Sequence, residues 1–382
     1  MTESKKSGMG VLLVCAFLAA VSNSGIFAAL SDLQDKYGFS DAGLGYIAAA
    51  GFLTSVVVSI TVAPFADRGH PKMLVIAGLT VSAAGSALFA LSGSLVAFIV
   101  ARGLIGAAMG TAGPAIRALA ANLDPNRAAE RLGRLRGIEM AGFTGGPLIG
   151  ALLIEATSVN GMFVFFCSFA VFALVVVAPR ELPTLPSTGE SQRLSLELLR
   201  LRPIRAASIA SLTLFLPVGI YDALWDRYVT DRGGTNLMVG LSFLLYSIPF
   251  ILFGARGGRI ADQRGARTMA LIGIACAAPV VCVYGLLTNA WLIVLFGTVE
   301  GLVGAIALPA AQSMMARAAP EGRAAAAQGL MGAGDLTTAA IVSLIAPMIY
   351  GSAGPEVTFA VAAGAMAVLG VLVAYESRDV RN

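Results

Sequence analysis

The 382-residue chain contains 57% apolar and 13% charged residues, and its mean hydropathy is +0.82. A water-soluble globule of this size needs more polar surface, so the composition places the chain in a lipid bilayer. The net charge is only +4, and the basic residues follow membrane topology, so the charge gives no reason to expect nucleic-acid binding.

Twelve stretches are long and apolar enough to cross about 30 Å of hydrocarbon as helices of about 20 residues. They are apolar on all sides, whereas the strands of a membrane barrel alternate in polarity. We therefore expect an all-α membrane protein with 12 transmembrane helices. The expected spans are 9–30, 43–65, 72–91, 94–116, 134–156, 160–178, 206–226, 237–257, 268–287, 290–315, 325–349 and 356–375.

The first span follows Lys5 and Lys6, which is also how a signal peptide begins. No small-residue cleavage site is evident and eleven more spans follow, so we interpret it as a retained helix. Most of the 26 Lys and Arg residues fall in the segments that lie on the same side as this N-terminus. The positive-inside rule then predicts a protein of the cell membrane with both termini in the cytoplasm.

Charged residues inside the spans are the strongest clue to function, because each costs at least about 2.5–3.5 kcal/mol at the centre of a membrane helix. A carboxylate that couples transport to protons must gain and lose charge, and Asp335, near the middle of its span, fits best, with Glu300 second. The alternative is a buried charge that only fixes helix packing. In chain order, the candidates for proton coupling are Arg102, Glu139, Asp222, Glu300 and Asp335.

The sequence repeats at an offset of about 194 residues: Gly25–Asp32 returns as Gly219–Asp226. Two similar halves in the same orientation are the design of a solute transporter. We expect six-helix bundles at 1–178 and 206–382, joined by a cytoplasmic linker at 179–205. The end of that linker resembles a short amphipathic helix lying on the membrane surface.

The cysteine and histidine residues do not indicate a metal-binding or catalytic site. The four cysteines lie in apolar spans without the spacing of metal ligands, and His70 is the single histidine. We expect no metal, no cofactor and no enzyme activity.

Two loops carry a family resemblance. Ala63–Lys72 and Gly257–Arg267 resemble the cytoplasmic loop signature of the major facilitator superfamily, and the resemblance covers nearly the whole chain. The first copy is one residue short and contains Pro71. The resemblance implies an ion-pair network that closes the cytoplasmic side; the alternative is a loop that only sets topology. The residues implied in this gating are Asp67, Arg68, Lys72, Asp262 and Arg264.

Two spans extend the resemblance. Arg102–Gly110 is similar to the fourth-helix motif of these transporters, whose Arg is linked to proton coupling. Gly142–Gly150 is similar to a fifth-helix motif of proton-driven exporters, in which Gly142 and Gly146 permit close packing and Pro147 permits bending. The alternative is helix packing without a role in antiport. In the family fold the fourth and tenth helices face each other, which implies a pair between Arg102 and Glu300.

A mostly apolar substrate pocket with few polar groups suits an amphipathic organic molecule better than a sugar. The aromatic candidates could equally face lipid or anchor the membrane interface. The residues expected to line the pocket are Asn23, Phe27, Tyr221, Trp225, Tyr246 and Gln312.

The sequence therefore predicts a secondary active transporter, a monomer that uses protons to export small lipophilic or amphipathic compounds. One alternative is an importer or facilitator of a polar metabolite, which the same fold supports. A receptor or scaffold without transport is disfavoured, because the linker is too short to form an effector domain.

Overall fold

The hydrophobic stretches fold as helices, because in hydrocarbon each backbone N–H and C=O group must find its partner within the same segment. The computed structural model describes residues 2–62, 71–123, 128–180, 196–321 and 323–378, and these contain no strand. The chain divides into two units, residues 1–192 and 193–382.

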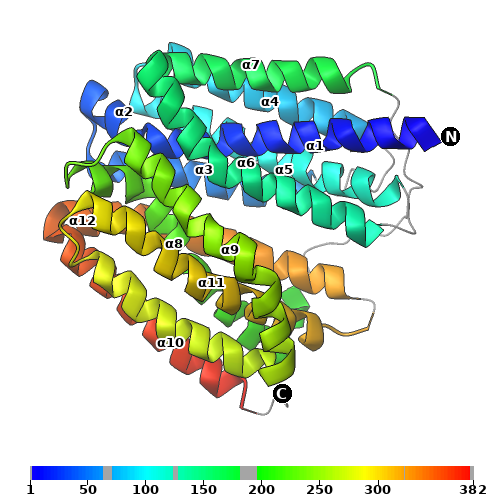
Figure 1. The fold of residues 1–382 in the computed structure, drawn as a ribbon, viewed down its shortest axis with the longest axis vertical. Coiled ribbons are helices and arrows are strands. Elements are labelled where there is room, and N and C mark those ends of the chain that lie inside the picture. The colour runs from blue at the N-terminus through cyan, green and yellow to red at the C-terminus, as the bar shows by residue number, and fades with distance from the viewer. Residues whose placement is uncertain (1, 63–70, 124–127, 181–195, 322, 379–382) are drawn as a thin grey trace. The chain divides into compact units, whose positions relative to one another are not determined.

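Unit 1 is a helical bundle in which α5 packs against both α3 and α4, and α1 packs against α6 and α7 (Figure 1). Its core surrounds Leu12, Leu119 and Val177, none of which is exposed to solvent. Its elements are α1 (Thr2–Ser24), η1 (Gly25–Ala28), α2 (Leu30–Tyr37), α3 (Asp41–Thr61), α4 (Pro71–Leu91), α5 (Leu95–Asn122), α6 (Ala128–Ala156) and α7 (Val159–Val177).

Unit 2 repeats this arrangement. Here α11 packs against α9 and α10, and α8 packs against the long α12, as α5 and α1 do in unit 1. The core surrounds Ile204, Ala207 and Met315. The elements are η4 (Leu196–Arg200), α8 (Arg202–Thr230), α9 (Asn236–Arg264), α10 (Ala266–Tyr284), α11 (Ala290–Ala318) and α12 (Ala324–Glu376).

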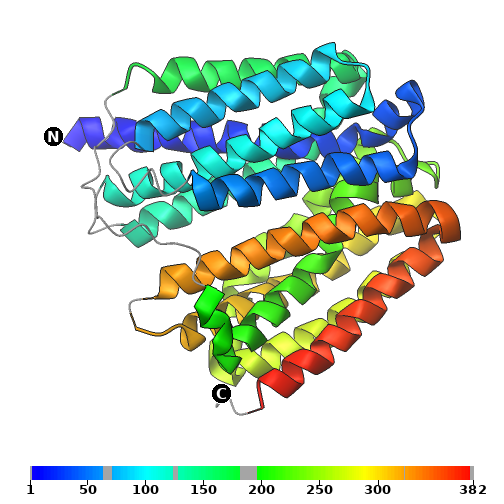
Figure 2. The same cartoon turned by 180° about the vertical axis from the view of Figure 1, so that it is seen from behind.

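The helix α12 is two membrane spans, although its backbone hydrogen bonds run on with little interruption. Its 53 residues would measure about 80 Å as one straight helix, far more than a bilayer needs. Gly354 interrupts it with φ 80° and ψ 177°, a conformation that is essentially restricted to glycine, and Pro355 follows. Figure 2 shows the red half turning back sharply from the end of the orange half. With this division, the eleven helices of the described residues that are long and apolar enough to cross a membrane become the predicted twelve.

Side-chain caps begin several of the helices. Ser94, Ser158, Thr235 and Asn289 accept hydrogen bonds from backbone N–H groups in the first turns of α5, α7, α9 and α11. Each cap satisfies donors that have no partner within the helix.

The segment before α8 differs from the predicted surface helix. Its described part, η4, is a 3-10 helix, and Leu198 is only 2% exposed in the core of unit 2. Leu198 therefore packs within the protein, whereas Leu196 at the start of the same segment is 61% exposed.

Candidate functional site

Asp335 lies on α12 where that helix packs against α8. Its side chain is 9% exposed, and its Oδ2 accepts a hydrogen bond of 2.8 Å from the Ser211 hydroxyl. Its Oδ1 is buried and has no hydrogen-bond partner among the described residues. A membrane carboxylate with one open oxygen can accept a proton there without breaking an existing bond.

Close packing holds α8 and α12 together near this carboxylate. A Cβ added to Gly219 would come within 2.8 Å of Val342 Cβ, so only glycine allows the two helices this separation. Pro217 lies in α8 between Ser211 and Tyr221, and it removes one backbone hydrogen bond from the helix.

Glu300 on α11 is held by two tyrosines. The Tyr221 hydroxyl donates to Oε1 at 2.7 Å, and the Tyr284 hydroxyl donates to Oε2 at 2.9 Å. Tyr221 belongs to α8 and Tyr284 is the last residue of α10, so the carboxylate joins three helices of unit 2.

Aromatic rings surround Glu300. The Trp225 ring centroid lies 4.9 Å from that of Tyr221 and 5.1 Å from that of Tyr284, and both contacts are edge-to-face. The Trp225 indole N–H donates to the Ser242 hydroxyl at 2.7 Å. Tyr246 of α9 lies against α11, with its hydroxyl 3.3 Å from the position of a Cβ on Gly304.

The corresponding region of unit 1 contains a positively charged side chain. Arg102 on α5 is 3% exposed and donates from one terminal nitrogen to the backbone oxygen of Asn23 at 2.7 Å and to its side-chain oxygen at 3.3 Å. Its guanidinium lies 5.5 Å from the ring centroid of Phe27. Phe27 and Tyr221 stand at matching positions in the sequence repeat, as do Arg102 and Glu300.

The structure thus brings together two groups of predicted residues: Asn23, Phe27 and Arg102 in unit 1, and Tyr221, Trp225, Tyr246 and Glu300 in unit 2. A pair between Arg102 and Glu300 would join the two units and stays a prediction. Gln312 is exposed and lies twelve residues along α11 from Glu300, about 18 Å for a helix, so it does not join the aromatic group.

The other predicted coupling acids have different surroundings. Glu139 on α6 forms salt bridges with Arg117 at 3.3 Å and with Arg136 at 3.6 Å. Asp222 is 4% exposed on α8. Sequence reasoning did not identify Ser211 and Tyr284, the hydroxyl donors to Asp335 and Glu300.

Part of the predicted gating set is visible. Asp262, on the last turns of α9, accepts hydrogen bonds from Ser313 at 3.2 Å and from Arg317 at 3.1 Å. Lys72 donates to the backbone oxygen of Ala178 at 2.8 Å. Arg264 is the last residue of α9. Asp67 and Arg68 lie outside the described residues.

The predicted glycine motif lies where α6 crosses α1. A Cβ on Gly142 would come within 2.7 Å of the Phe17 oxygen, and one on Gly146 within 2.9 Å of the Val21 oxygen. Pro147 follows within α6. The same face continues to Gly150, where a Cβ would meet the Gly25 oxygen at 2.6 Å.

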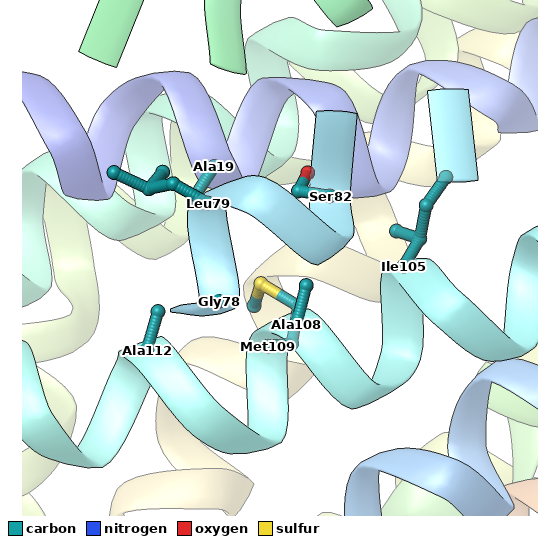
Figure 3. A pocket seen from close by; sticks show the side chains of 8 residues that line it. All are labelled: Ala19, Gly78, Leu79, Ser82, Ile105, Ala108, Met109 and Ala112. Atoms are coloured by element: carbon teal, nitrogen blue, oxygen red, sulfur yellow. The ribbon is translucent and has the colours of Figure 1, made fainter. Parts of the chain in front are cut away.

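Two cavities in unit 1 do not resemble a substrate site. The first, between α1, α4 and α5, measures about 10 Å³, and Ser82 supplies the hydroxyl among its labelled side chains (Figure 3). This space is barely enough for one water molecule. The second is an open groove of about 740 Å³ lined by apolar residues of α1, α6 and α7, such as Phe17 and Phe169. Such a surface suits contact with lipid tails.

Comparisons with known proteins agree with this architecture. Residues 12–225 and 207–381 match the family model described as Major Facilitator Superfamily. The chain is 25% identical to the maltose permease of Geobacillus stearothermophilus, over 80% of this chain and 78% of that protein. It is 24% identical to the quinolone resistance protein NorA of Staphylococcus aureus (strain MSSA476), over 51% of each.

Solved structures share the fold. The nucleoside transporter NupG has a TM-score of 0.78 at 14% identity, covering 96% of this chain and 98% of that one. A POT family transporter in complex with a thioalcohol-conjugated peptide has a TM-score of 0.80 at 14% identity, covering 98% and 97%.

Proposed function

The chain belongs to the Major Facilitator Superfamily, and we propose that it is a proton-coupled exporter of small lipophilic or amphipathic organic compounds. It is a multi-pass membrane protein with twelve spans in two six-helix repeats. The family is one of transporters, so substrate, direction and coupling are the open questions for this chain.

The proposal rests mainly on the surroundings of the Asp335 carboxylate. A membrane carboxylate is costly, and this one has a single hydrogen bond, from Ser211, and one open oxygen. No ion pair is present at Asp335 in the described part of unit 2. A carboxylate locked in a salt bridge would resist protonation, whereas this one can be neutralised at Oδ1.

The helix α8 supplies the physical link from proton to substrate. It contacts Asp335 through Ser211 and Glu300 through Tyr221, ten residues further on. That separation is about 15 Å along a helix, and Pro217 lies between the two contacts. A change at Asp335 that shifts α8 would thus reach the aromatic group around Glu300. Arg102, Glu139 and Asp222 are secondary candidates in the same coupling.

The aromatic group around Glu300 supports a lipophilic substrate. Tyr221 and Tyr246 are half-buried and contribute large, mainly apolar rings, and Trp225 packs behind Tyr221. The similarity to the quinolone resistance protein NorA and, at 24% identity over 46% of this chain, to the multidrug resistance protein 1 of Bacillus subtilis supports efflux as well.

The second candidate is import or facilitated passage of a polar metabolite. The match to the maltose permease favours it, because that match covers 80% of this chain and the match to NorA covers 51%. Proton-driven export and import predict accumulation in opposite directions, and facilitated passage predicts no accumulation, so one assay separates them.

The test uses everted membrane vesicles with an acidic lumen and a panel of dyes, lipophilic drugs and sugars. A proton-coupled exporter accumulates lipophilic compounds in the lumen, and collapse of the pH gradient releases them. An importer driven by protons accumulates its substrate only in right-side-out vesicles with acid outside.

Asp335→Asn should abolish gradient-driven accumulation while the purified protein keeps its thermal unfolding transition, because the amide cannot exchange a proton at neutral pH. Glu155→Gln is the matched control, since Glu155 is an exposed carboxylate at the end of α6. Accumulation at the wild-type rate in Asp335→Asn would remove Asp335 from the coupling.

A further inference from the structure

Three arginines from different parts of unit 2 meet at the last turn of α12, and we call them the basic patch. Arg267, near the start of α10, donates from its Nε to the Ser377 hydroxyl at 2.8 Å. The guanidinium carbons of Arg202 and Arg378 lie 5.7 and 5.2 Å from the ring centroid of Tyr375. The first of these two begins α8 and the second follows the end of α12, so segments far apart in the chain place positive charge around one helix end.

The acid at this helix end is already occupied by another arginine. Glu376 is 14% exposed, and its Oε2 accepts hydrogen bonds from Arg205 Nε at 3.2 Å and from Arg205 Nη2 at 2.8 Å. Arg202 lies farther from the same oxygen, at 3.7 Å. Neither Arg267 nor Arg378 forms an ion pair with a described residue. The charges of these two arginines therefore remain available to an anion.

An exposed apolar face of α12 leads to the basic patch. Val368, Val371 and Leu372 are 70%, 72% and 40% exposed, and Tyr375 is 50% exposed. Their spacing of three and four residues places them on one side of the helix. In a membrane span such a side contacts lipid tails, and a tyrosine at its end is typical of the membrane interface. The basic patch therefore lies at the level of the lipid head groups.

We propose that the basic patch binds the phosphate head group of an anionic phospholipid, whose acyl chain lies along the exposed apolar face of α12. Guanidinium groups present paired N–H donors that match phosphate oxygens. A soluble phosphate compound would use the patch alone, whereas a phospholipid uses the patch and the adjoining apolar face. A zwitterionic lipid carries its own positive charge and gains less from the arginines. This binding does not depend on the proposed function.

The test measures the first lipid bound to the purified protein in detergent, by native mass spectrometry. Dioleoyl phosphatidylglycerol is the anionic probe, and dioleoyl phosphatidylcholine has the same chains without the net charge. We expect the anionic lipid to bind about tenfold more tightly or better, because each arginine near a head group contributes about fivefold in affinity.

Variants assign this preference to the patch. The double change Arg267→Gln, Arg378→Gln should weaken binding of phosphatidylglycerol about five- to thirtyfold and leave binding of phosphatidylcholine unchanged. Arg259→Gln is the matched control, since Arg259 is an exposed arginine of α9 in the same unit, and it should bind both lipids as the wild type does.

A single reversal of charge gives an independent measurement. Arg378 is exposed and lies beyond the end of α12, so Arg378→Glu should fold even if the double variant does not. It should weaken binding of phosphatidylglycerol more than Arg378→Gln does, because a carboxylate repels the phosphate. Glycerol 1-phosphate, which has no acyl chain, should fail to displace the lipid even in large excess.

Equal binding of the two lipids by the wild type, or the same loss in Arg259→Gln as in the patch variants, would overturn the site. Displacement of phosphatidylglycerol by glycerol 1-phosphate at a comparable concentration would also overturn it, because the patch would then be a site for soluble phosphates. These outcomes leave proton-driven export untouched, since the vesicle assay tests it separately.

Discussion

Ser211 forms a hydrogen bond with only one of the two carboxylate oxygens of Asp335. Ser211 donates to Oδ2, and Oδ1 stays buried without a partner in the described residues. A buried acceptor without a hydrogen bond costs about 1–3 kcal/mol of stability. A carboxylate that served only to pack the helices would not need this unsatisfied oxygen. This asymmetry favours a carboxylate whose second oxygen is used during the transport cycle.

Removing the serine should expose that cost. Ser211→Ala leaves both oxygens of Asp335 without a donor, so the protein should lose about 1–3 kcal/mol of stability, seen as a lower midpoint of thermal unfolding. In an Asp335→Asn background the same substitution should cost less, because the buried group is then neutral. A coupling of about 0.5–3 kcal/mol in the double-mutant cycle is expected.

Ser208, one turn earlier on α8, provides the matched control. Its hydroxyl is buried and has no hydrogen-bond partner in the described part of the chain, so Ser208→Ala should leave the unfolding midpoint unchanged or raise it. Equal effects of the two serine substitutions would show that the bond from Ser211 to Asp335 contributes nothing.

Charged residues are the easiest candidates to name from the sequence, because their chemistry is rare in a membrane. Asp335, Glu300 and Arg102 stand out in apolar spans, whereas Ser211 and Tyr284 resemble many other residues of their helices. Ser211 and Tyr284 contact Asp335 and Glu300 across helices, and periodicity does not reveal such contacts.

At the scale of helices, the contact of α6 with α1 depends on missing side chains. Gly142→Ala should push the two helices apart, because its Cβ would meet the Phe17 oxygen at 2.7 Å and the Ala20 Cβ at 2.8 Å. Such overpacking costs about 1–3 kcal/mol. The thermal unfolding midpoint in detergent should fall by a corresponding amount.

Gly145 separates packing from helix propensity. No heavy atom lies within 4 Å of the position of its Cβ, so Gly145→Ala should be neutral or stabilise the helix by about 0.5–1 kcal/mol. If Gly145→Ala and Gly142→Ala destabilise equally, the glycines act through the backbone and not through the contact.

The presence of each helix was easier to predict than the residues at which it begins and ends. Hydropathy reports where a helix crosses hydrocarbon, so α9 and α11 continue past the predicted spans to Arg264 and Ala318. The first predicted span, 9–30, also breaks: the structure has a 3-10 turn at Gly25–Ala28 and a new helix from Leu30. Apolar sequence alone does not show such a break.

At the scale of the whole molecule, the resemblance implies that Asp262 closes the cytoplasmic side. The Asp262 and Arg317 side chains are 62% and 49% exposed, so their pair contributes little stability. Asp262→Asn should therefore barely change the unfolding midpoint but shift the population toward the inward-open state. Labelling of Asn23→Cys from the outer side should fall.

Glu197 and Arg323 form a comparably exposed pair in the same unit, so Glu197→Gln serves as the control and should leave labelling unchanged. Unchanged labelling in both variants would mean that the loop near Asp262 only sets topology.

The repeat made the architecture of the molecule predictable. Matching segments at an offset of about 194 residues already indicate two similar bundles, and the same helix pairs pack in each unit. Substrate and direction are not predictable in this way, because they depend on a few side chains placed by helices from distant parts of the chain.

Gly354 determines whether the chain crosses the membrane an odd or an even number of times. An odd number of spans would leave the two ends on opposite faces of the membrane, and α12 read as one helix gives eleven. The positive φ of Gly354 divides α12 into two spans, so the number of spans becomes even. A reporter fused at the C-terminus should therefore share the compartment of one fused at the N-terminus, although no loop separates the last two crossings.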